Sequence, residues 1–149
     1  ALIQAAAQRA SREAKLESAA QGAAFLSAVT DAWDIPGFGP WQAVLSERGT
    51  DIPYAAAVAA VSAAAGIPLR EGLSSYLHAL AANYISAGVR LIPLGQTDGQ
   101  RTLAGLFETI DAAADRAIAQ GDAPWGTAAP LLDLFSMQHE TQYTRLFRS

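Results

Sequence analysis

The sequence predicts an all-α fold, a single-domain orthogonal or antiparallel bundle of about six to seven helices around a central apolar helix at about residues 69–91. Alanine, the strongest helix former, supplies 34 of the 149 residues. β-branched residues occur singly, and no stretch alternates between apolar and polar with the period of two that marks a strand. The length suits one domain, so we expect residues 1–149 to form a single helical domain.

The first predicted helix covers about residues 1–32, as one long helix or two in line. Its second half carries Phe25, Leu26 and Val29 at helical spacing, whereas its first half is largely polar. Because most helix stability comes from packing an apolar face, the polar half should pack on protein that precedes Ala1. The chain also begins without Met, so we expect an N-terminally incomplete domain.

A loop and two short helices are predicted next. Residues 34–40 are rich in Gly and Pro, but their glycines do not fit G-x-G-x-x-G, so this is a turn and not a phosphate loop. A short helix should follow at about 41–48. The next helix should start at Pro53 and stop at Gly66. Since it is built almost only of Ala and Val, we expect it to be buried all round.

The central helix should begin at Leu69 and end before Pro93, which lacks the N–H that a helix needs. It is apolar on two sides and is expected to lie between two layers. After it, Thr97-x-x-Gln100 has the form of a capping box for a helix over about 97–119, with Asp98 in the first turn, where the helix dipole favours a negative charge.

Two carboxylates on that helix, Asp111 and Asp115, stand one turn apart, as an acid–base pair would. They lie opposite Leu103, Phe107 and Ile110, so a solvated face is the favoured interpretation. A last helix is predicted over about 131–142.

Charge and composition exclude several classes of function. The net charge is −4 and Lys15 is the single lysine, so no basic face exists for nucleic acid. The absence of cysteine removes disulfides and thiolate chemistry and fits a reducing compartment, and we expect a cytoplasmic protein. No apolar run approaches the ~18 residues that span a membrane, and no signal-like segment is present.

The two histidines do not predict a metal site. His139-Glu140-x-x-Tyr143 resembles the zinc motif H-E-x-x-H, but Tyr143 stands where the second histidine must be. His139 is therefore interpreted as a mostly buried side chain that needs a hydrogen-bond partner. A nickel site shared with His78 would require the fold or a dimer axis to bring the two together. We assign no metal ligand and no bound cofactor.

No nucleophile, base and oxyanion donor come together in the sequence, so we expect a protein that is not an enzyme. The alternative is a helical enzyme that uses His139 and Glu140 as acid and base, and a second alternative is a purely structural module that dimerises through its small-residue helices.

The end of the chain, residues 143–149, is predicted to be a partner-binding tail. Arg145-Leu146-Phe147-Arg148 combines two cations with two large apolar side chains, a composition typical of anchors that dock into a partner. The alternative, that Leu146 and Phe147 fold back onto their own domain, is equally open on physical grounds.

Three ordered motifs give the chain a resemblance to the UreF family of urease accessory proteins. They are QGAAF at 21–25, RLIPLGQTDGQR at 90–101 and SMQHETQYTRLFRS at 136–149. The similarity runs from about Leu16 to Ser149, and the Gly- and Ser-rich N-terminal part of the family is absent.

The resemblance implies an all-helical, non-catalytic chaperone. Proteins of this family act as adaptors in nickel insertion into urease apoprotein, form homodimers, bind the partner UreD (also called UreH) and recruit the GTPase UreG, whose activity they are proposed to regulate. Nickel and GTP are then implied only through that GTPase, and whether this chain contacts nickel is left open.

The resemblance also implies two sets of partner-binding residues. In the tail they are Tyr143, Arg145, Leu146, Phe147 and Arg148, with Arg145 as a charge-assisted contact to the GTPase. Around the start of the predicted helix at about 97–119 they are Gln96, Asp98 and Gln100, for which helix capping is the equally weighted alternative.

Overall fold

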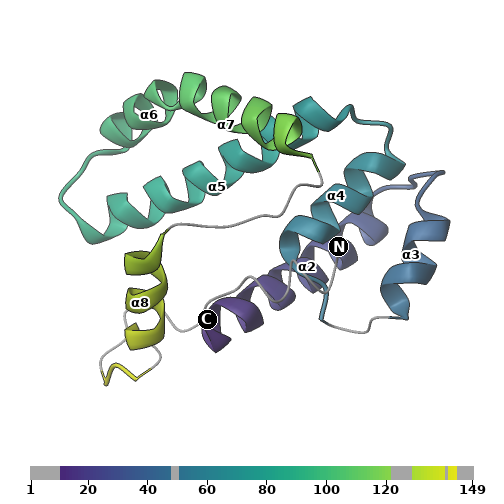
Figure 1. Ribbon diagram of the computed structural model, residues 1–149, viewed down its shortest axis with the longest axis horizontal. Coiled ribbons are helices and arrows are strands. Elements are labelled where there is room, and N and C mark those ends of the chain that lie inside the picture. The colour runs from purple at the N-terminus through teal and green to yellow at the C-terminus, as the bar shows by residue number, and fades with distance from the viewer. Residues whose placement is uncertain (1–10, 48–50, 122–128, 140, 144–149) are drawn as a thin grey trace. The chain divides into compact units, whose positions relative to one another are not determined.

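The computed structural model describes residues 11–47, 51–121, 129–139 and 141–143. Within these ranges the chain contains seven helices and no strand, which confirms the all-α prediction (Figure 1). The helices are α2 (Arg12–Ala32), α3 (Gly39–Ser46), α4 (Tyr54–Ala64), α5 (Leu69–Leu91), α6 (Gln96–Gly105), α7 (Phe107–Gln120) and α8 (Pro130–His139).

Contacts divide the chain into two compact units. The first unit holds α2, α3, α4 and α8, and the second holds α5, α6 and α7. The expectation that residues 1–149 form one domain remains a prediction. In the described part of the chain, none of the helices combines the length and the apolar character that crossing a bilayer requires.

The core of the first unit lies between α2 and α4, with α3 against α4. Its buried side chains are Val29, Phe38, Leu45, Ile52, Ala57, Ala60 and Val61. Alanines on α4 and Gly22 on α2 let the two helices approach closely. A Cβ at Gly22 would collide with the carbonyl oxygen of Ile52 and would lie 3.2 Å from the backbone nitrogen of Tyr54.

Two serines accept hydrogen bonds from backbone N–H groups at the N-termini of α2 and α4. Ser11 caps α2, since its Oγ accepts from the backbone N–H of Ala14 at 3.1 Å. The N-cap of α4 is Pro53, whose side chain has no hydrogen-bond acceptor. Ser18, buried on α2, supplies the acceptor instead, and the Tyr54 N–H donates to its Oγ at 3.2 Å.

The burial of α4 differs from the expectation. Ala57, Ala60 and Val61 are buried, but Ala59 is exposed, so the helix is covered on one side only. Periodicity could not predict this, because a helix of Ala and Val carries no polar face to mark the outside.

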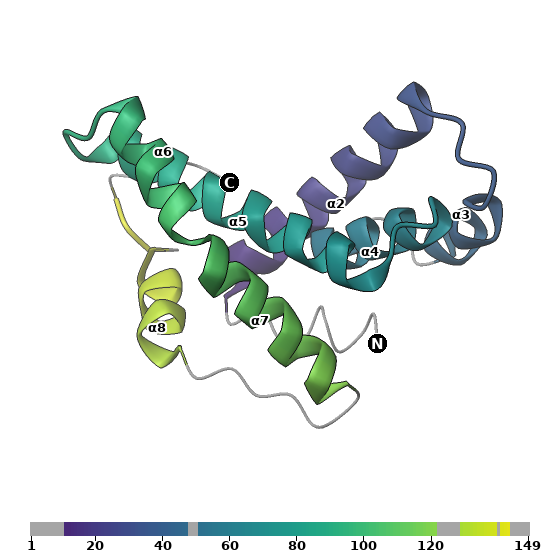
Figure 2. The same cartoon turned by 90° about the horizontal axis from the view of Figure 1, so that it is seen from above.

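In the second unit α6 and α7 return along α5 (Figure 1 and Figure 2). The predicted helix at 69–91 is confirmed as α5, yet none of its residues is buried, and its large side chains Leu69, Tyr84 and Leu91 are exposed. The predicted single helix over 97–119 is wrong, because Leu106 separates two helices, α6 and α7.

Candidate functional site

The segment between α5 and α6 carries a mixed apolar and polar surface, which we call the joint surface. Three of its side chains are large and apolar and are about half exposed: Leu91 at 53%, Ile92 at 54% and Leu94 at 46%. The predicted binding residues Gln96, Asp98 and Gln100 are all exposed as well. The joint surface consists of Leu91, Ile92, Leu94, Gln96, Asp98 and Gln100.

Local backbone chemistry holds this segment in place. Pro93 ends α5, and Ile92, the C-cap, is extended with φ −120° and ψ 151°. Gly99 is buried against α5, where an added Cβ would lie 2.9 Å from Val89 Cγ2 and 3.3 Å from Ile85 Cγ2. Because Gly99 has no side chain, the first turn of α6 can pack directly against α5.

The predicted capping box does not form. The N-cap of α6 is Gly95, and no side chain caps the helix. Asp98 does lie in the first turn, as predicted, and forms an ion pair with Arg101 at 3.2 Å. The side chains of Gln96 and Gln100 make no hydrogen bond to any other residue that the structure describes. The glutamines are thus available for contacts with another protein.

The predicted tail is described only at its start. Tyr143 is fully exposed. Arg145, Leu146, Phe147 and Arg148 lie outside the described residues, so their binding role stays a prediction.

His139 has the polar partner that the sequence required. Its Nδ1 lies 2.8 Å from Glu13 Oε2 of α2, and its side chain is 36% exposed, so it is half-buried. One turn earlier Ser136 Oγ lies 2.6 Å from Ser11 Oγ. Neither contact could be predicted from the sequence, because the partners are more than 120 residues apart.

The two histidines are not brought together within either unit. His78 belongs to the second unit and stacks on Phe107, with ring centroids 5.6 Å apart. Among the described residues no group of three or more histidines and carboxylates is placed to hold a metal ion. Glu140, the partner of His139 in the enzyme alternative, lies outside the described residues.

Helix α8 turns its polar side toward α2. Its less exposed residues are Asp133, Ser136 and His139, and the last two make the contacts with Ser11 and Glu13. Its large apolar side chains are exposed instead: Leu131, Leu132, Leu134, Phe135 and Met137.

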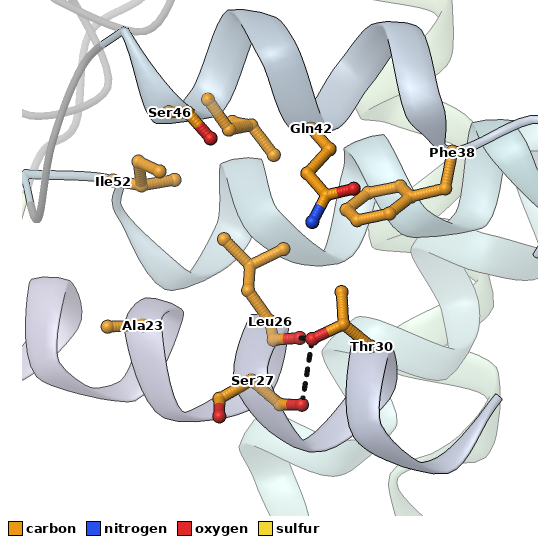
Figure 3. Close-up of a pocket in the computed structure, with 9 residues that line it drawn as sticks. Ala23, Leu26, Ser27, Thr30, Phe38, Gln42, Ser46 and Ile52 are labelled. Carbon is orange, nitrogen blue, oxygen red and sulfur yellow. Dashed lines mark hydrogen bonds between the residues drawn. The ribbon is translucent and has the colours of Figure 1, made fainter. Parts of the chain in front are cut away.

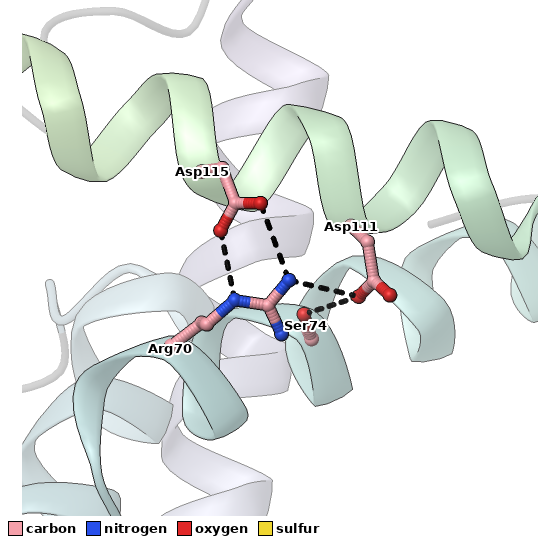
Figure 4. Close-up of polar contacts among 4 residues, drawn as sticks. All are labelled: Arg70, Ser74, Asp111 and Asp115. Atoms are coloured by element: carbon pink, nitrogen blue, oxygen red, sulfur yellow. Dashed lines mark hydrogen bonds and ion pairs between the residues drawn. The ribbon is translucent and has the colours of Figure 1, made fainter.

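A polar cluster joins α5 to α7 (Figure 4). Arg70 donates two hydrogen bonds to Asp115, from Nε at 2.8 Å and from Nη2 at 3.2 Å, and its Nη2 lies 3.8 Å from Asp111. Ser74 Oγ donates to Asp111 at 3.1 Å. The hydrogen bond from Arg70 lowers the pKa of the Asp115 carboxyl, and its positive charge acts in the same direction.

The two aspartates are exposed, as predicted, but they are ion-paired rather than only solvated. A carboxylate with a depressed pKa that is held by an arginine is a poor proton acceptor, so Asp115 is poorly suited to act as a general base, and the cluster joins α5 to α7. The spacing in the sequence could have predicted this cluster. Arg70 and Ser74 on α5 are one helical turn apart, and so are Asp111 and Asp115 on α7.

Comparison with known proteins places the chain in a family. The UreF family model matches residues 3–107. The chain is 49% identical over 144 residues to the urease accessory protein UreF of Granulibacter bethesdensis, covering 97% of the chain and 60% of that protein. The UreF of Rhodopseudomonas palustris is 48% identical over 97% of the chain and 59% of the relative.

A third relative extends the pattern. The UreF of Bradyrhizobium diazoefficiens is 46% identical over 93% of the chain and 56% of its own length. The chain thus spans somewhat more than half of the length of these relatives. They are named as accessory proteins rather than as enzymes, in agreement with the expectation of a non-catalytic chain. The family model and the relatives together confirm the resemblance carried by the three motifs, and the chain belongs to the UreF family.

Proposed function

We propose that this chain serves urease maturation as an adaptor that assists nickel insertion into urease apoprotein. It bridges UreD/UreH and the GTPase UreG in the cytoplasm, acts as a homodimer and regulates the GTPase. Nickel is the cargo of this assembly, and GTP belongs to the GTPase. Family membership carries the proposal, since the relatives are named urease accessory proteins.

The joint surface supports a role in binding other proteins. Half-exposed Leu91, Ile92 and Leu94 beside exposed glutamine and carboxylate groups make an apolar centre with a polar rim, the composition of a transient interface. Gly99 anchors this surface on α5, so it is preformed and loses little conformational entropy on binding.

The test is co-expression with UreD/UreH, UreG and urease apoprotein, with capture on a tagged UreD/UreH. We expect the double substitution Ile92→Ser, Leu94→Ser to weaken capture of the chain or of the GTPase by about tenfold or more, because two apolar contacts are lost. Urease activation by nickel in the same cells should fall with it.

Ile67→Ser is the matched control. Ile67 is 46% exposed, like Leu94, and belongs to the same unit, but it is not part of the joint surface. Its capture should equal that of the wild type. If the double variant is captured as well as the wild type and urease activation is normal, the joint surface is not a binding site. If the wild-type chain does not join the assembly at all, the proposed adaptor function is wrong.

A further inference from the structure

A groove in the first unit lies between α2 and α3 (Figure 3). Its floor is apolar and is part of the core of that unit: Phe38, Leu45 and Ile52 are buried there, and Leu26 packs against them. The open volume is about 240 Å³. An apolar cavity of about 150 Å³ admits benzene, so this groove has room for one large apolar side chain.

The rim of the groove is polar but carries no charge. Ser27, Thr30, Gln42 and Ser46 line it. The hydroxyl of Thr30 donates to the carbonyl oxygens of Leu26 and Ser27, at 2.9 and 3.0 Å, and the Ser27 hydroxyl donates to Asp31 at 3.3 Å. Two hydroxyl protons are therefore already used within α2. A polar ligand would find few free donors, and an apolar group is the better occupant.

The chain segments that form the groove carry acidic and aromatic side chains. Between Lys15 and Arg48 the sequence contains four acidic residues and no basic one: Glu17, Asp31, Asp34 and Glu47. All four are exposed. Trp33 at the end of α2 and Trp41 on α3 are also exposed, at 65% and 43%. Carboxylates attract cations, and tryptophan faces bind guanidinium and ammonium groups.

We propose that the α2–α3 groove binds a segment of a partner protein that presents one large apolar side chain with arginine or lysine beside it. The apolar side chain enters between Leu26 and Leu45, and the flanking cations meet Asp31, which is hydrogen-bonded to the lining residue Ser27, and Glu47, which follows the lining residue Ser46. This surface belongs to the first unit, whereas the joint surface belongs to the second, so the proposal does not rest on the function proposed above.

The test uses a fluorescein-labelled helical peptide with one phenylalanine and an arginine one turn away on each side. Fluorescence anisotropy with the full chain should give saturable binding. Replacing the phenylalanine of the peptide by alanine should weaken binding by about tenfold or more, because the buried ring is lost. Replacing its arginines by glutamates should weaken it by at least about two- to fivefold.

Variants of the chain locate the binding. Ala23→Trp fills the groove and should abolish binding, whereas Ala24→Trp, at an exposed neighbouring position of α2 that does not line it, should bind as the wild type does. Glu47→Lys should weaken binding, and Glu108→Lys, an equal change of charge at an exposed position of α7, should not. Circular dichroism would establish that each variant keeps its helices.

Three results would overturn the proposal. The first is equal binding by Ala23→Trp and by the wild type. The second is equal affinity for the arginine and glutamate peptides. The third is tighter peptide binding by a chain cut after Gln142, which would assign the groove to the end of this chain itself.

Discussion

At the scale of single residues, Gly22 shows how one missing side chain decides a packing distance. The backbone of the segment at Ile52 and Tyr54 crosses α2 where a Cβ would stand. We expect Gly22→Ala to lower the free energy of unfolding by about 1–3 kcal/mol, because the contact must open to admit a methyl group. Urea denaturation followed by circular dichroism measures the change.

Gly39→Ala is the control for that substitution. A Cβ at Gly39 meets nothing within 4 Å, so the midpoint of unfolding should stay the same or rise slightly. Equal destabilisation by the two substitutions would show that the close contact of Gly22 with the segment at Ile52 does not cause the effect.

Individual contacts were only partly predictable from the sequence. Asp98 was correctly placed in the first turn of a helix, because dipole preference is local. The N-cap was assigned to Thr97 and is Gly95, since several residues near Pro93 can start a helix. The partner of His139 could not be named, because Glu13 is brought to it only by the packing of α8 on α2.

At the scale of helices, the contact between α5 and α7 should weaken in acid. Arg70 holds the pKa of Asp115 below its ordinary value of 3.8 in the folded chain. The contribution of this pair to stability is therefore complete above the ordinary pKa and is lost as the pH falls through the lower, folded pKa. NMR titration of the Asp115 carboxyl carbon should give a midpoint below 3.8.

Arg70→Gln tests the cause of that shift. Without the guanidinium, the midpoint of Asp115 should return toward its ordinary value, and high salt should move the wild-type midpoint the same way. A midpoint in the variant as low as in the wild type would show that Arg70 does not set it.

The positions of whole helices were predicted better than the breaks between them and the burial of their side chains. Proline at both ends and a continuous apolar pattern placed α5 at its observed bounds. The interruption at Leu106 was missed, because Gly105-Leu106 carries no proline and the apolar period continues into α7. Burial was the weakest prediction, since Ala-rich helices have no distinct inner and outer face.

At the scale of the whole molecule, the prediction concerns the tail. A chain cut after Gln142 should keep its helicity and its thermal midpoint but should lose binding to the proposed partners UreD/UreH and UreG, because it lacks the proposed anchor at residues 143–149. Arg145→Ala alone should keep the fold and weaken only recruitment of the GTPase in a pull-down. Unfolding of the cut chain would instead assign the tail to its own domain.

The sequence predicted the fold class and the family of the chain, but not its division into two compact units. Alanine content and the missing strand pattern were sufficient for all-α, and three motifs were sufficient for the family. The two compact units were not predicted, because the Gly- and Pro-containing stretches at their boundaries, 66–68 and 121–130, have the same composition as ordinary turns between helices. Of the candidate site, the exposed polar residues at 96–100 were predicted, whereas the half-exposed leucines and isoleucine beside them were not.

The orientation of α8 has a practical consequence. The polar face of α8 packs on α2, while its leucine, phenylalanine and methionine side chains are exposed to water. An exposed apolar patch of this kind promotes self-association. Purified by itself, the chain should cluster as its concentration rises, be retained on hydrophobic-interaction resin and enhance the fluorescence of an ANS dye. Replacing Leu132 and Phe135 by glutamine should relieve all three effects without unfolding α8.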